Sequence, residues 1–488
     1  MTALTLSDPT LLREANCIDG NWVQADSGAT QLVRNPATGE IVGAIPSMGV
    51  AETRRAIEAA SRAFPAWRAT LAADRAAILR RLNALMLEHL EDLAVIMTAE
   101  QGKPLAESRG EIRYAASFIE WFAEEARRVY GDTIPQNEHG RRILVLKEPV
   151  GVFAAITPWN FPAAMIARKA GPGWAAGCTG VLRPASQTPF STLAIAALAE
   201  RAGLPPGVCN VVTGPAEAIG GELTANPVVR KLSFTGSTET GAKLIRQCAG
   251  TVKRLSMELG GNAPFIVFDD ADLEAAVEGA MASKFRNSGQ TCVSANRILV
   301  QDAVYGAFAE RLTAAVGALR VGNGMDAGIT QGPMINAAAV EKVEEHIADA
   351  VAAGAQVLIG GARHALGGNF FQPTVLGGVP PAALVFREET FGPLAPLFRF
   401  RTEAEAVALA NDTPFGLAAY FYSRDLGRIF RVTEALEYGI IGVNEGLIST
   451  AVAPFGGMKA SGLGREGSQY GIDEYLEIKY VALGGIGA

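Results

Sequence analysis

One cysteine stands where a nucleophile could be presented. Of the five cysteines in the chain, Cys292 alone follows a polar, glycine-containing turn (286–291), which itself comes directly after a helix-like stretch. Exposed junctions of this kind are where proteins display functional groups. A thiolate there could attack a carbonyl carbon and form a covalent adduct. On composition alone, a small core residue is an equally good interpretation of Cys292.

Glu258 is a candidate general base. It lies between Met257 and Leu259, and burial in such an apolar setting would raise its pKa. A carboxylate with a raised pKa can take a proton from water. Considered alone, Glu258 is better interpreted as a structural or surface carboxylate.

Two further motifs would present polar groups at the ends of strands. Asn160 lies between Pro158 and Pro162, which would hold its amide in place to donate to a developing oxyanion, although a plain turn is the alternative. A glycine turn at Gly236 and Ser237 precedes a predicted helix, whose first amides could bind a cofactor phosphate. The glycines match only part of the dinucleotide-binding fingerprint, so this motif is weak alone.

The elements that would position these groups alternate between strand and helix. Strands are predicted over 151–156, 180–182, 208–212 and 231–234, and helices over 191–202, 217–224 and 237–248. This alternation indicates a doubly wound parallel sheet. A second α/β block begins near Pro264, with a strand over 265–267 and a helix over 273–284.

The flanking segments carry different signals. Apolar residues at helical spacing predict one helix over 74–100, capped by Asp74, and another over 105–129. Two strand-like runs, 142–147 and 475–481, stand apart from both α/β blocks. We expect these runs to pair into a small projecting sheet whose edge meets another subunit.

Composition limits the class of protein. The 488 residues are enough for roughly three domains, 49% of them are hydrophobic, and the net charge of -7 without a basic run is a poor match to nucleic acid. No secretory signal is visible, and the longest uncharged stretch, 149–167, contains three prolines, so we predict a cytoplasmic protein without a membrane partner. Scattered cysteines and four histidines without ligand spacing predict neither a disulfide framework nor a metal site.

Taken together, the four motifs, in this order and spacing, resemble the aldehyde dehydrogenase superfamily. The resemblance runs from about residue 18 to residue 480 and includes the runs 388–393 and 454–457. It implies an α/β fold with a Rossmann-type cofactor domain, an α/β catalytic domain and a small oligomerisation sheet. The implied boundaries are 1–130 and 149–257 for the dinucleotide-binding domain, 258–455 for the catalytic domain, and 131–148 and 456–488 for the oligomerisation extension.

The resemblance also implies roles for individual residues. Cys292 matches the nucleophile, Asn160 and the Cys292 amide match the oxyanion hole, and Glu258 matches the base that activates the deacylating water. Lys169 is a further implied catalytic residue, at a position where the family contacts the cofactor. The implied cofactor contacts are Trp159, Arg183, Ser186, Gly236, Ser237, Glu389 and Phe391. The presence of Glu258 implies release of a free acid rather than transfer to coenzyme A.

Cofactor preference follows from two positions. Relatives that prefer NAD usually carry glutamate where this chain has Ser186, and a carboxylate there would repel a 2′-phosphate whereas serine would not. Arg183, where the family usually has lysine, offers a planar fork suited to phosphate. We therefore predict that the cofactor is NADP by preference, with NAD as a second cofactor.

Within the superfamily, the chain most resembles bacterial succinate-semialdehyde dehydrogenases, which hold the distal carboxylate of the substrate with two arginines and a serine. Arg168, Arg286 and Ser449 stand at the matching positions. The alternative is that both arginines form structural ion pairs. We expect a homo-oligomer, dimer or tetramer, that oxidises succinate semialdehyde.

Two other functions stay open. Trp174 stands where that subfamily usually has leucine, so a different acidic or aromatic semialdehyde is one alternative, with Trp174 reshaping the substrate funnel. A non-catalytic binding protein on the same fold is the other. Ser294 replaces the second cysteine that some relatives carry near the nucleophile, so we expect no local disulfide switch.

Overall fold

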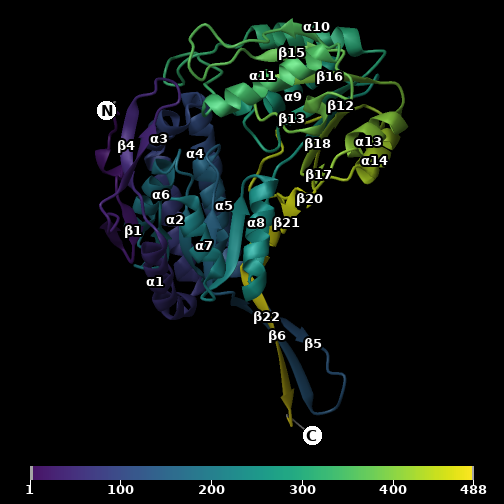
Figure 1. The fold of residues 1–488 in the computed structure, drawn as a ribbon. Helices are drawn as coiled ribbons and strands as arrows, with labels where there is room; N and C mark the ends of the chain where they lie inside the picture. The colour runs from purple at the N-terminus through teal and green to yellow at the C-terminus, as the bar shows by residue number, and fades with distance from the viewer. Residues whose placement is uncertain (1–3, 486–488) are drawn as a thin grey trace.

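The computed structural model describes residues 4–485 and shows two α/β lobes with a narrow sheet projecting from them (Figure 1). A six-stranded sheet in the order β21-β11-β10-β7-β8-β9 forms the centre of the first lobe, and all its strands except β21 run parallel. The strands are β7 (Val152–Ile156), β8 (Thr179–Arg183), β9 (Cys209–Val211), β10 (Val229–Thr235), β11 (Arg254–Glu258) and β21 (Gly462–Leu463). This confirms the predicted doubly wound sheet.

Strand order reverses beside β7, and this reversal opens a crevice. The chain proceeds from β7 through β8 to β9 on one side, and then returns to place β10 and β11 on the other. Loops that leave the carboxyl ends of β7 and β10 therefore diverge, which is where ligands bind in open α/β sheets. These two loops are the ones that contain Asn160 and Ser237.

Helices cover both faces of this sheet. They must do so because successive side chains of β7 point to opposite faces and all of them are buried. Phe153 and Ala155 pack into a core with α2 to α6, whereas Val152, Ala154 and Ile156 pack into a core with α1, α7 and α8. The helices are α1 (Val50–Ala69), α2 (Ala72–Glu88), α3 (Leu90–Gln101), α4 (Leu105–Glu125), α5 (Pro162–Ala176), α6 (Phe190–Arg201), α7 (Ala216–Ala225) and α8 (Thr238–Cys248).

The single helix predicted over 74–100 is wrong, because α2 and α3 are separate helices. His89 leaves the helical conformation at the junction, with φ −93° and ψ 21°. The apolar pattern continues across the break because Leu82 and Met86 of α2 share one core with Leu93 and Ile96 of α3. The spacing of apolar residues shows which face of a helix is buried, but it does not by itself show where the helix axis changes direction.

The second lobe contains a seven-stranded sheet in the order β14-β15-β16-β13-β12-β18-β19, in which only β14 is antiparallel. Its strands are β12 (Ala263–Val267), β13 (Ala295–Gln301), β14 (Gln356–Ile359), β15 (Thr374–Gly377), β16 (Leu394–Phe400), β18 (Ala418–Tyr422) and β19 (Ile440–Val443). The helices around it are α9 (Leu273–Lys284), α10 (Tyr305–Gly317), α11 (Ala337–Ala352), α12 (Leu384–Arg387), α13 (Glu403–Asn411) and α14 (Leu426–Ala435).

A short link joins the two sheets. Residues 259–262 lead from the carboxyl end of β11 to the amino end of β12. The carboxyl edge of the first sheet therefore faces the amino edge of the second, where β13 also begins. Glu258 and Cys292 lie at these two facing edges.

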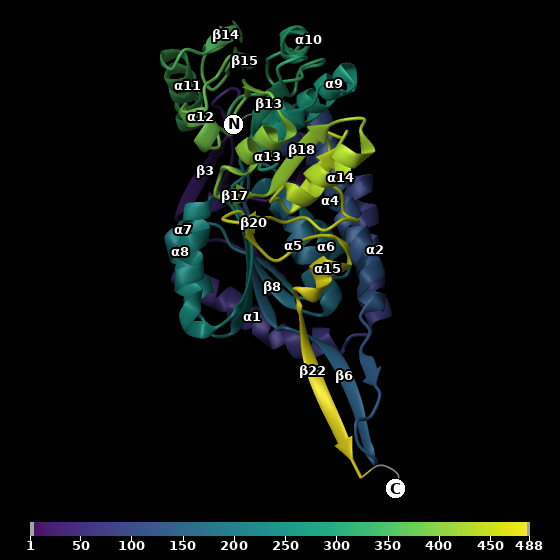
Figure 2. The ribbon, with the colours of Figure 1, turned by 90° about the vertical axis from the view of Figure 1, so that its right-hand side faces the viewer.

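The predicted projecting sheet is confirmed. β6 (Arg141–Pro149) pairs antiparallel with β22 (Leu476–Gly484) along its whole length, and β5 (Asp132–Ile134) adds a third strand. Figure 2 shows this arm extending away from both lobes, with the end of β22 at its tip.

The remaining elements are short. They are β1 (Asn16–Ile18), β2 (Asn21–Val23), β3 (Thr30–Arg34), β4 (Ile41–Pro46), β17 (Phe415–Gly416), β20 (Met458–Lys459) and α15 (Ser468–Asp473). Among residues 4–485, no helix combines the length and the apolar composition needed to cross a membrane.

Candidate active site

A central cavity of about 230 Å³ lies at the point where the strand order reverses. Its first-lobe wall is formed by the ends of β7 and β10 and by the link that follows β11. The second lobe contributes the remaining part of the wall, which includes Cys292, Glu389 and Phe391. The wall includes Pro158, Trp159, Asn160, Met165, Gly236, Ser237, Gly260, Cys292, Glu389 and Phe391. The structure thus brings together seven of the predicted catalytic and cofactor residues, namely Trp159, Asn160, Gly236, Ser237, Cys292, Glu389 and Phe391, whereas Glu258, Lys169, Arg183 and Ser186 lie outside this wall.

A second cavity, which we call the arginine-lined cavity, encloses about 20 Å³. Arg168, Arg286 and Ser449, the three predicted substrate contacts, all line it. Cys292 and Met165 line both cavities. The thiol therefore stands between the two cavities, where it can meet a molecule that enters from either one.

A tight turn presents Cys292. In the 3-10 segment Arg286–Gly289, Asn287 and Ser288 adopt φ of 51° and 54°, and Gly289 follows at 74°. Asparagine and glycine tolerate this left-handed conformation better than other residues. Gly261 allows the link before β12 to approach, because a Cβ there would lie 2.5 Å from the main-chain oxygen of Cys292.

The surroundings of Cys292 favour the neutral thiol over the thiolate. Burial raises the pKa of Cys292 to about 12, and the positive charge of Arg168 offsets burial only in part. The thiolate expected from the sequence must therefore be generated during the reaction by removal of a proton.

Glu258 ends β11 and is buried, which agrees with the raised pKa expected from its apolar neighbours. Neither carboxyl oxygen has a hydrogen-bond partner among residues 4–485. Burial, reinforced by Glu466, raises the pKa of Glu258 well above its usual value, although Arg168 and Lys169 act against this. The side chain lies beside the cavities and lines neither of them, and a Cβ on Gly456 would come within 2.9 Å of its Oε1.

Behind the cavities, Glu466 forms buried ion pairs with both Arg168 and Lys169. Burial opposes the charge on Glu466, but Lys169 and Arg168 outweigh burial and hold its pKa below the usual value. Arg168 also lies over the ring of Phe455, at 4.2 Å from its centroid. Lys169 is thus held away from the cavity wall, and Arg168 combines a structural ion pair with exposure to the arginine-lined cavity.

Sequence reasoning missed Glu466. It is 297 residues from Lys169 along the chain, and a lone acid in a glycine-rich segment carries no signal of its pairing. Arg286, in contrast, forms no ion pair within residues 4–485, and its Nε is buried without a hydrogen-bond partner. Arg286 is therefore the freer of the two cations that line the small cavity.

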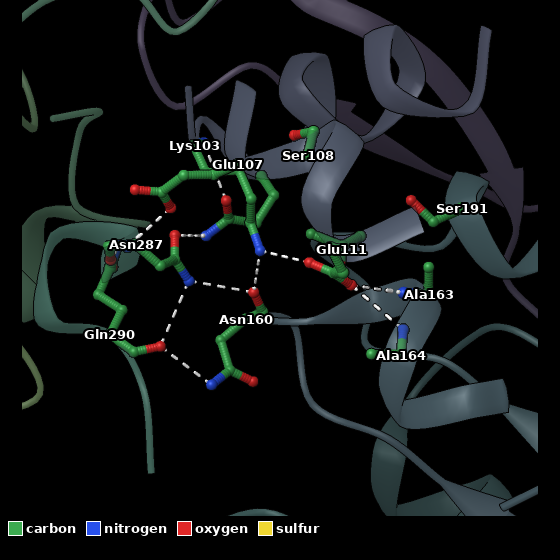
Figure 3. Close-up of polar contacts among 12 residues, drawn as sticks. Lys103, Glu107, Ser108, Glu111, Asn160, Ala163, Ala164, Ser191, Asn287 and Gln290 are labelled. Carbon is green, nitrogen blue, oxygen red and sulfur yellow. Dashed lines mark hydrogen bonds and ion pairs between the residues drawn. The ribbon is translucent and has the colours of Figure 1, made fainter. Parts of the chain in front are cut away.

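Asn160 is aimed at the loop that carries the nucleophile. Its Nδ2 donates to the main-chain oxygen of Gln290 at 3.0 Å (Figure 3). An amide nitrogen carries two hydrogens, so one donor remains for another acceptor in the cavity. Beside it, the rings of Trp159 and Phe391 meet edge to face with centroids 5.7 Å apart.

Residues 22–481 match the aldehyde dehydrogenase family. The chain belongs to this family. The match covers both lobes and most of the arm, so that the nucleophile, the link and the strand-order reversal all fall inside it. The recognition from four ordered motifs is thereby confirmed.

Similar aldehyde dehydrogenases cover nearly the full chain. Glutarate-semialdehyde dehydrogenase of Pseudomonas aeruginosa is 66% identical over 99% of this chain and 100% of its own length. Succinate-semialdehyde dehydrogenase (NADP(+)) of Escherichia coli is 66% identical over 99% of this chain and 100% of its own length. 3-Sulfolactaldehyde dehydrogenase of Pseudomonas putida is 65% identical over 99% of each chain. A crystal structure described as an E. coli NADP-dependent enzyme superimposes with a TM-score of 0.98, at 66% identity over 98% of this chain and 100% of that one.

In this aldehyde dehydrogenase, the predicted cofactor contacts fall into two groups. Ser237 caps the start of α8, and Gly236, Trp159, Glu389 and Phe391 share the central cavity with it. Burial raises the pKa of Glu389 to about 8. The second group, Arg183 and Ser186, lies outside the cavity wall, near the carboxyl end of the neighbouring strand β8.

The second group still lies at the carboxyl edge of the first sheet, along which a dinucleotide would extend. Arg183 is paired in register with Ile156 at the end of β7, and its Nη2 donates to the oxygen of Gly214 at 3.3 Å. Its Nε is buried and has no partner among the described residues. The amino end of α8 and the positively charged Arg183 suit the pyrophosphate and the ribose end of NAD(P).

Trp174 does not shape the substrate site. It is 1% exposed, packs into the first-lobe core and lines neither cavity. The funnel expected from its replacement of leucine is therefore wrong, because this position of α5 points into the core.

Proposed function

We propose that this protein oxidises succinate semialdehyde to succinate with NADP, and with NAD as a second cofactor. The observation that carries the proposal is the place of Cys292, between a cavity lined by Trp159, Glu389 and Phe391 and a cavity lined by Arg168, Arg286 and Ser449. The names of the similar proteins support a substrate with a distal anionic group.

The first step is attack of the Cys292 sulfur on the aldehyde carbon. The thiol proton leaves as the S–C bond forms, and we assign its uptake to water in the cavity, which passes it to solvent, so that Glu258 stays free to act in the later hydrolysis. The carbonyl oxygen becomes an oxyanion that accepts hydrogen bonds from Asn160 Nδ2 and from the Cys292 amide. One such donor contributes roughly 2.7–4 kcal/mol to stabilising the transition state.

Bound NAD(P) supplies the acceptor for the hydride that leaves this carbon. Trp159, Glu389 and Phe391, which line the central cavity with Cys292, would hold the reacting end of the cofactor. Collapse of the oxyanion leaves a thioester on the Cys292 sulfur. Glu258 then takes a proton from water, the hydroxide attacks the thioester carbon, and the acid and the free thiol are released.

Two residues support the preference for NADP. Ser186 places no negative charge where a 2′-phosphate would lie, and Arg183 places a positive charge nearby, at the carboxyl end of β8. The E. coli relative that is 66% identical is named for NADP(+).

Arg286 supports the anionic substrate. A charge-assisted hydrogen bond contributes about 1.5–3 kcal/mol, which corresponds to roughly tenfold to a hundredfold in affinity. Arg168 adds charge, but its pairing with Glu466 leaves less of it for the substrate. Glutarate semialdehyde and 3-sulfolactaldehyde are the second candidates, since the same cation would bind their anionic groups.

The test is a panel of aldehydes with both cofactors, measured as kcat/KM. Succinate semialdehyde should give the highest value with NADP, above glutarate semialdehyde and 3-sulfolactaldehyde. Arg286→Ala should raise KM for succinate semialdehyde about tenfold or more while KM for butanal stays nearly unchanged. Equal changes in KM for both aldehydes would contradict the binding of the substrate's distal carboxylate by Arg286. A higher kcat/KM for another aldehyde would make that aldehyde the better candidate for the substrate.

A further inference from the structure

A buried polar network lies behind Asn160, and the reaction described above does not use it directly (Figure 3). At its centre is Lys103, which is 1% exposed and lines neither cavity. Its Nζ donates to Glu111 Oε2 at 2.5 Å and to the main-chain oxygen of Asn160 at 2.7 Å, and lies 3.9 Å from the centroid of the Phe161 ring. A buried ammonium needs such partners, since desolvation of an unpaired charge is costly.

Asn287 ties the same oxygen to the nucleophile loop. Its Nδ2 donates to the main-chain oxygen of Asn160 at 3.0 Å and to that of Gln290 at 3.3 Å. Gln101 Nε2 holds the opposite end of the Asn287 amide through Oδ1 at 2.9 Å. Asn160 is therefore fixed at its main-chain oxygen by Lys103 and Asn287, and at its side chain by Gln290.

Glu111 extends the network to the helix that follows Asn160. Its Oε1 accepts from the amides of Ala163 at 2.9 Å and Ala164 at 3.2 Å, in the first turn of α5. Its other oxygen is the one that binds Lys103. One carboxylate thus fixes the segment that follows Asn160 while it compensates the charge of the lysine that holds Asn160 itself.

We propose that Lys103 is a positioning residue that, with Glu111 and Asn287, sets the placement of the Asn160 amide relative to Cys292. The inference rests on the proposed function, in which Asn160 donates to the oxyanion. A small misplacement of a catalytic group is enough to slow the chemistry, and a displacement of 1 Å can cost about a hundredfold in rate. Lys103 itself reaches neither cavity, so it can act only through the residues that it contacts, and Asn160 is the one among them to which we assign a catalytic role.

The first experiment measures the single-turnover rate of reduced cofactor formation in Lys103→Met. Methionine keeps the length of the chain but removes all three donors. We expect a fall of about tenfold to a hundredfold in this rate, with KM for NADP within about twofold of the parent. A rate close to the parent value, or a change confined to KM for NADP, would overturn the proposal.

A double variant separates positioning from general loosening. Asn160→Ala alone should slow the single-turnover rate about 10²–10³-fold, the usual loss for one oxyanion donor. If Lys103 acts through Asn160, adding Lys103→Met to Asn160→Ala should slow the rate by less than about threefold further. Losses that multiply in the double variant would show that Lys103 acts elsewhere.

Lys253 offers a matched control. Like Lys103 it is a buried lysine whose Nζ donates to main-chain oxygens, those of Asn226 at 2.9 Å and Val229 at 3.1 Å, but it lies at the amino edge of the first sheet. Lys253→Met should leave the single-turnover rate within about twofold of the parent. An equal loss of rate in this variant would contradict a specific role for Lys103.

A second variant covers the case in which Lys103→Met does not fold. Asn287→Gly removes the other donor to the Asn160 oxygen, and glycine tolerates the φ of 51° at this position. It should slow the single turnover and show the same lack of additivity with Asn160→Ala. A single-turnover rate close to the parent value in Asn160→Ala would refute the oxyanion role of Asn160 itself. If Asn160→Ala is slow but Lys103→Met and Asn287→Gly react at the parent rate, only the positioning proposal is refuted.

Discussion

At the scale of single residues, burial favours the protonated forms of the two groups to which we assign the chemistry. Burial raises the pKa of both Cys292 and Glu258, and Arg168 opposes the shift at each of them without cancelling it. A neutral thiol reacts with oxidants and metals less readily than a thiolate does. The same burial means that attack by Cys292 depends on proton removal, and so on pH.

We predict that kcat/KM rises with pH between about pH 6 and about pH 9. Groups with raised pKa values are protonated below those values, so each increase in pH enlarges the reactive fraction of Cys292 and Glu258. The slope is at most about tenfold per unit for each proton lost. A profile measured with saturating NADP that is flat, or that falls over this range, would contradict the assignment.

We propose that Ser186 contributes to the cofactor preference. Ser186→Glu should lower kcat/KM for NADP by about tenfold or more, through repulsion of the 2′-phosphate, and should affect NAD much less. Gln187→Glu is the matched control, since it adds the same charge one residue away on an exposed side chain. Equal effects of both substitutions on the NADP/NAD ratio would show that Ser186 has no specific role.

At the scale of elements, the arm presents an unusual apolar face. Ile478 and Tyr480 of β22 point to the same side and are 70% and 64% exposed. Their register partners across the sheet are Lys147 and Val145. Exposed apolar residues on a narrow sheet indicate an interface, and we expect a second copy of this chain to cover it.

We predict that Ile478→Asp shifts the protein to a smaller assembly in sedimentation velocity. A buried, unpaired carboxylate would oppose docking of the arm. Lys479→Ala, which changes the neighbouring side chain on the opposite face, should leave the assembly unchanged. An unaltered sedimentation coefficient in Ile478→Asp would place the interface elsewhere.

The elements show how far the sequence could predict the site. Alternating apolar runs located β7, β8, β9 and β10 and thereby the loops that carry Asn160 and Ser237, because these signals are local. β11 was not predicted, since its polar Arg254 and Ser256 hide the strand that presents Glu258. The Lys103 network was also missed, because Gln101 and Asn287 are 186 residues apart and only folding brings them together.

At the scale of the whole molecule, the chain returns from the second lobe to complete the first. β21 pairs with β11, and Ile472, Tyr475 and Leu476 join the first-lobe core. Glu466 lies on this returning segment and neutralises the two buried cations of α5. The charges of Arg168 and Lys169 in the first lobe are thus balanced by a residue that the chain supplies only after it has passed through the second lobe.

We predict that Glu466→Gln lowers the free energy of unfolding by roughly 3–5 kcal/mol, the usual cost of leaving a buried charge unpaired. Urea unfolding monitored by fluorescence gives the measurement. Glu477→Gln is the control, because its pair with Arg254 is half-exposed and should contribute no more than about 1 kcal/mol. Similar losses for the two variants would contradict the role given to Glu466.

The central claim is that a thioester forms on Cys292, and Glu258→Gln allows it to be trapped. Without the base, water attack should be slow while acylation proceeds. After mixing this variant with succinate semialdehyde and NADP, mass spectrometry of a digest should find a succinyl group on the peptide that contains Cys292, and none when NADP is omitted. Absence of the adduct, or an adduct on Cys17, Cys178, Cys209 or Cys248 instead, would contradict the account.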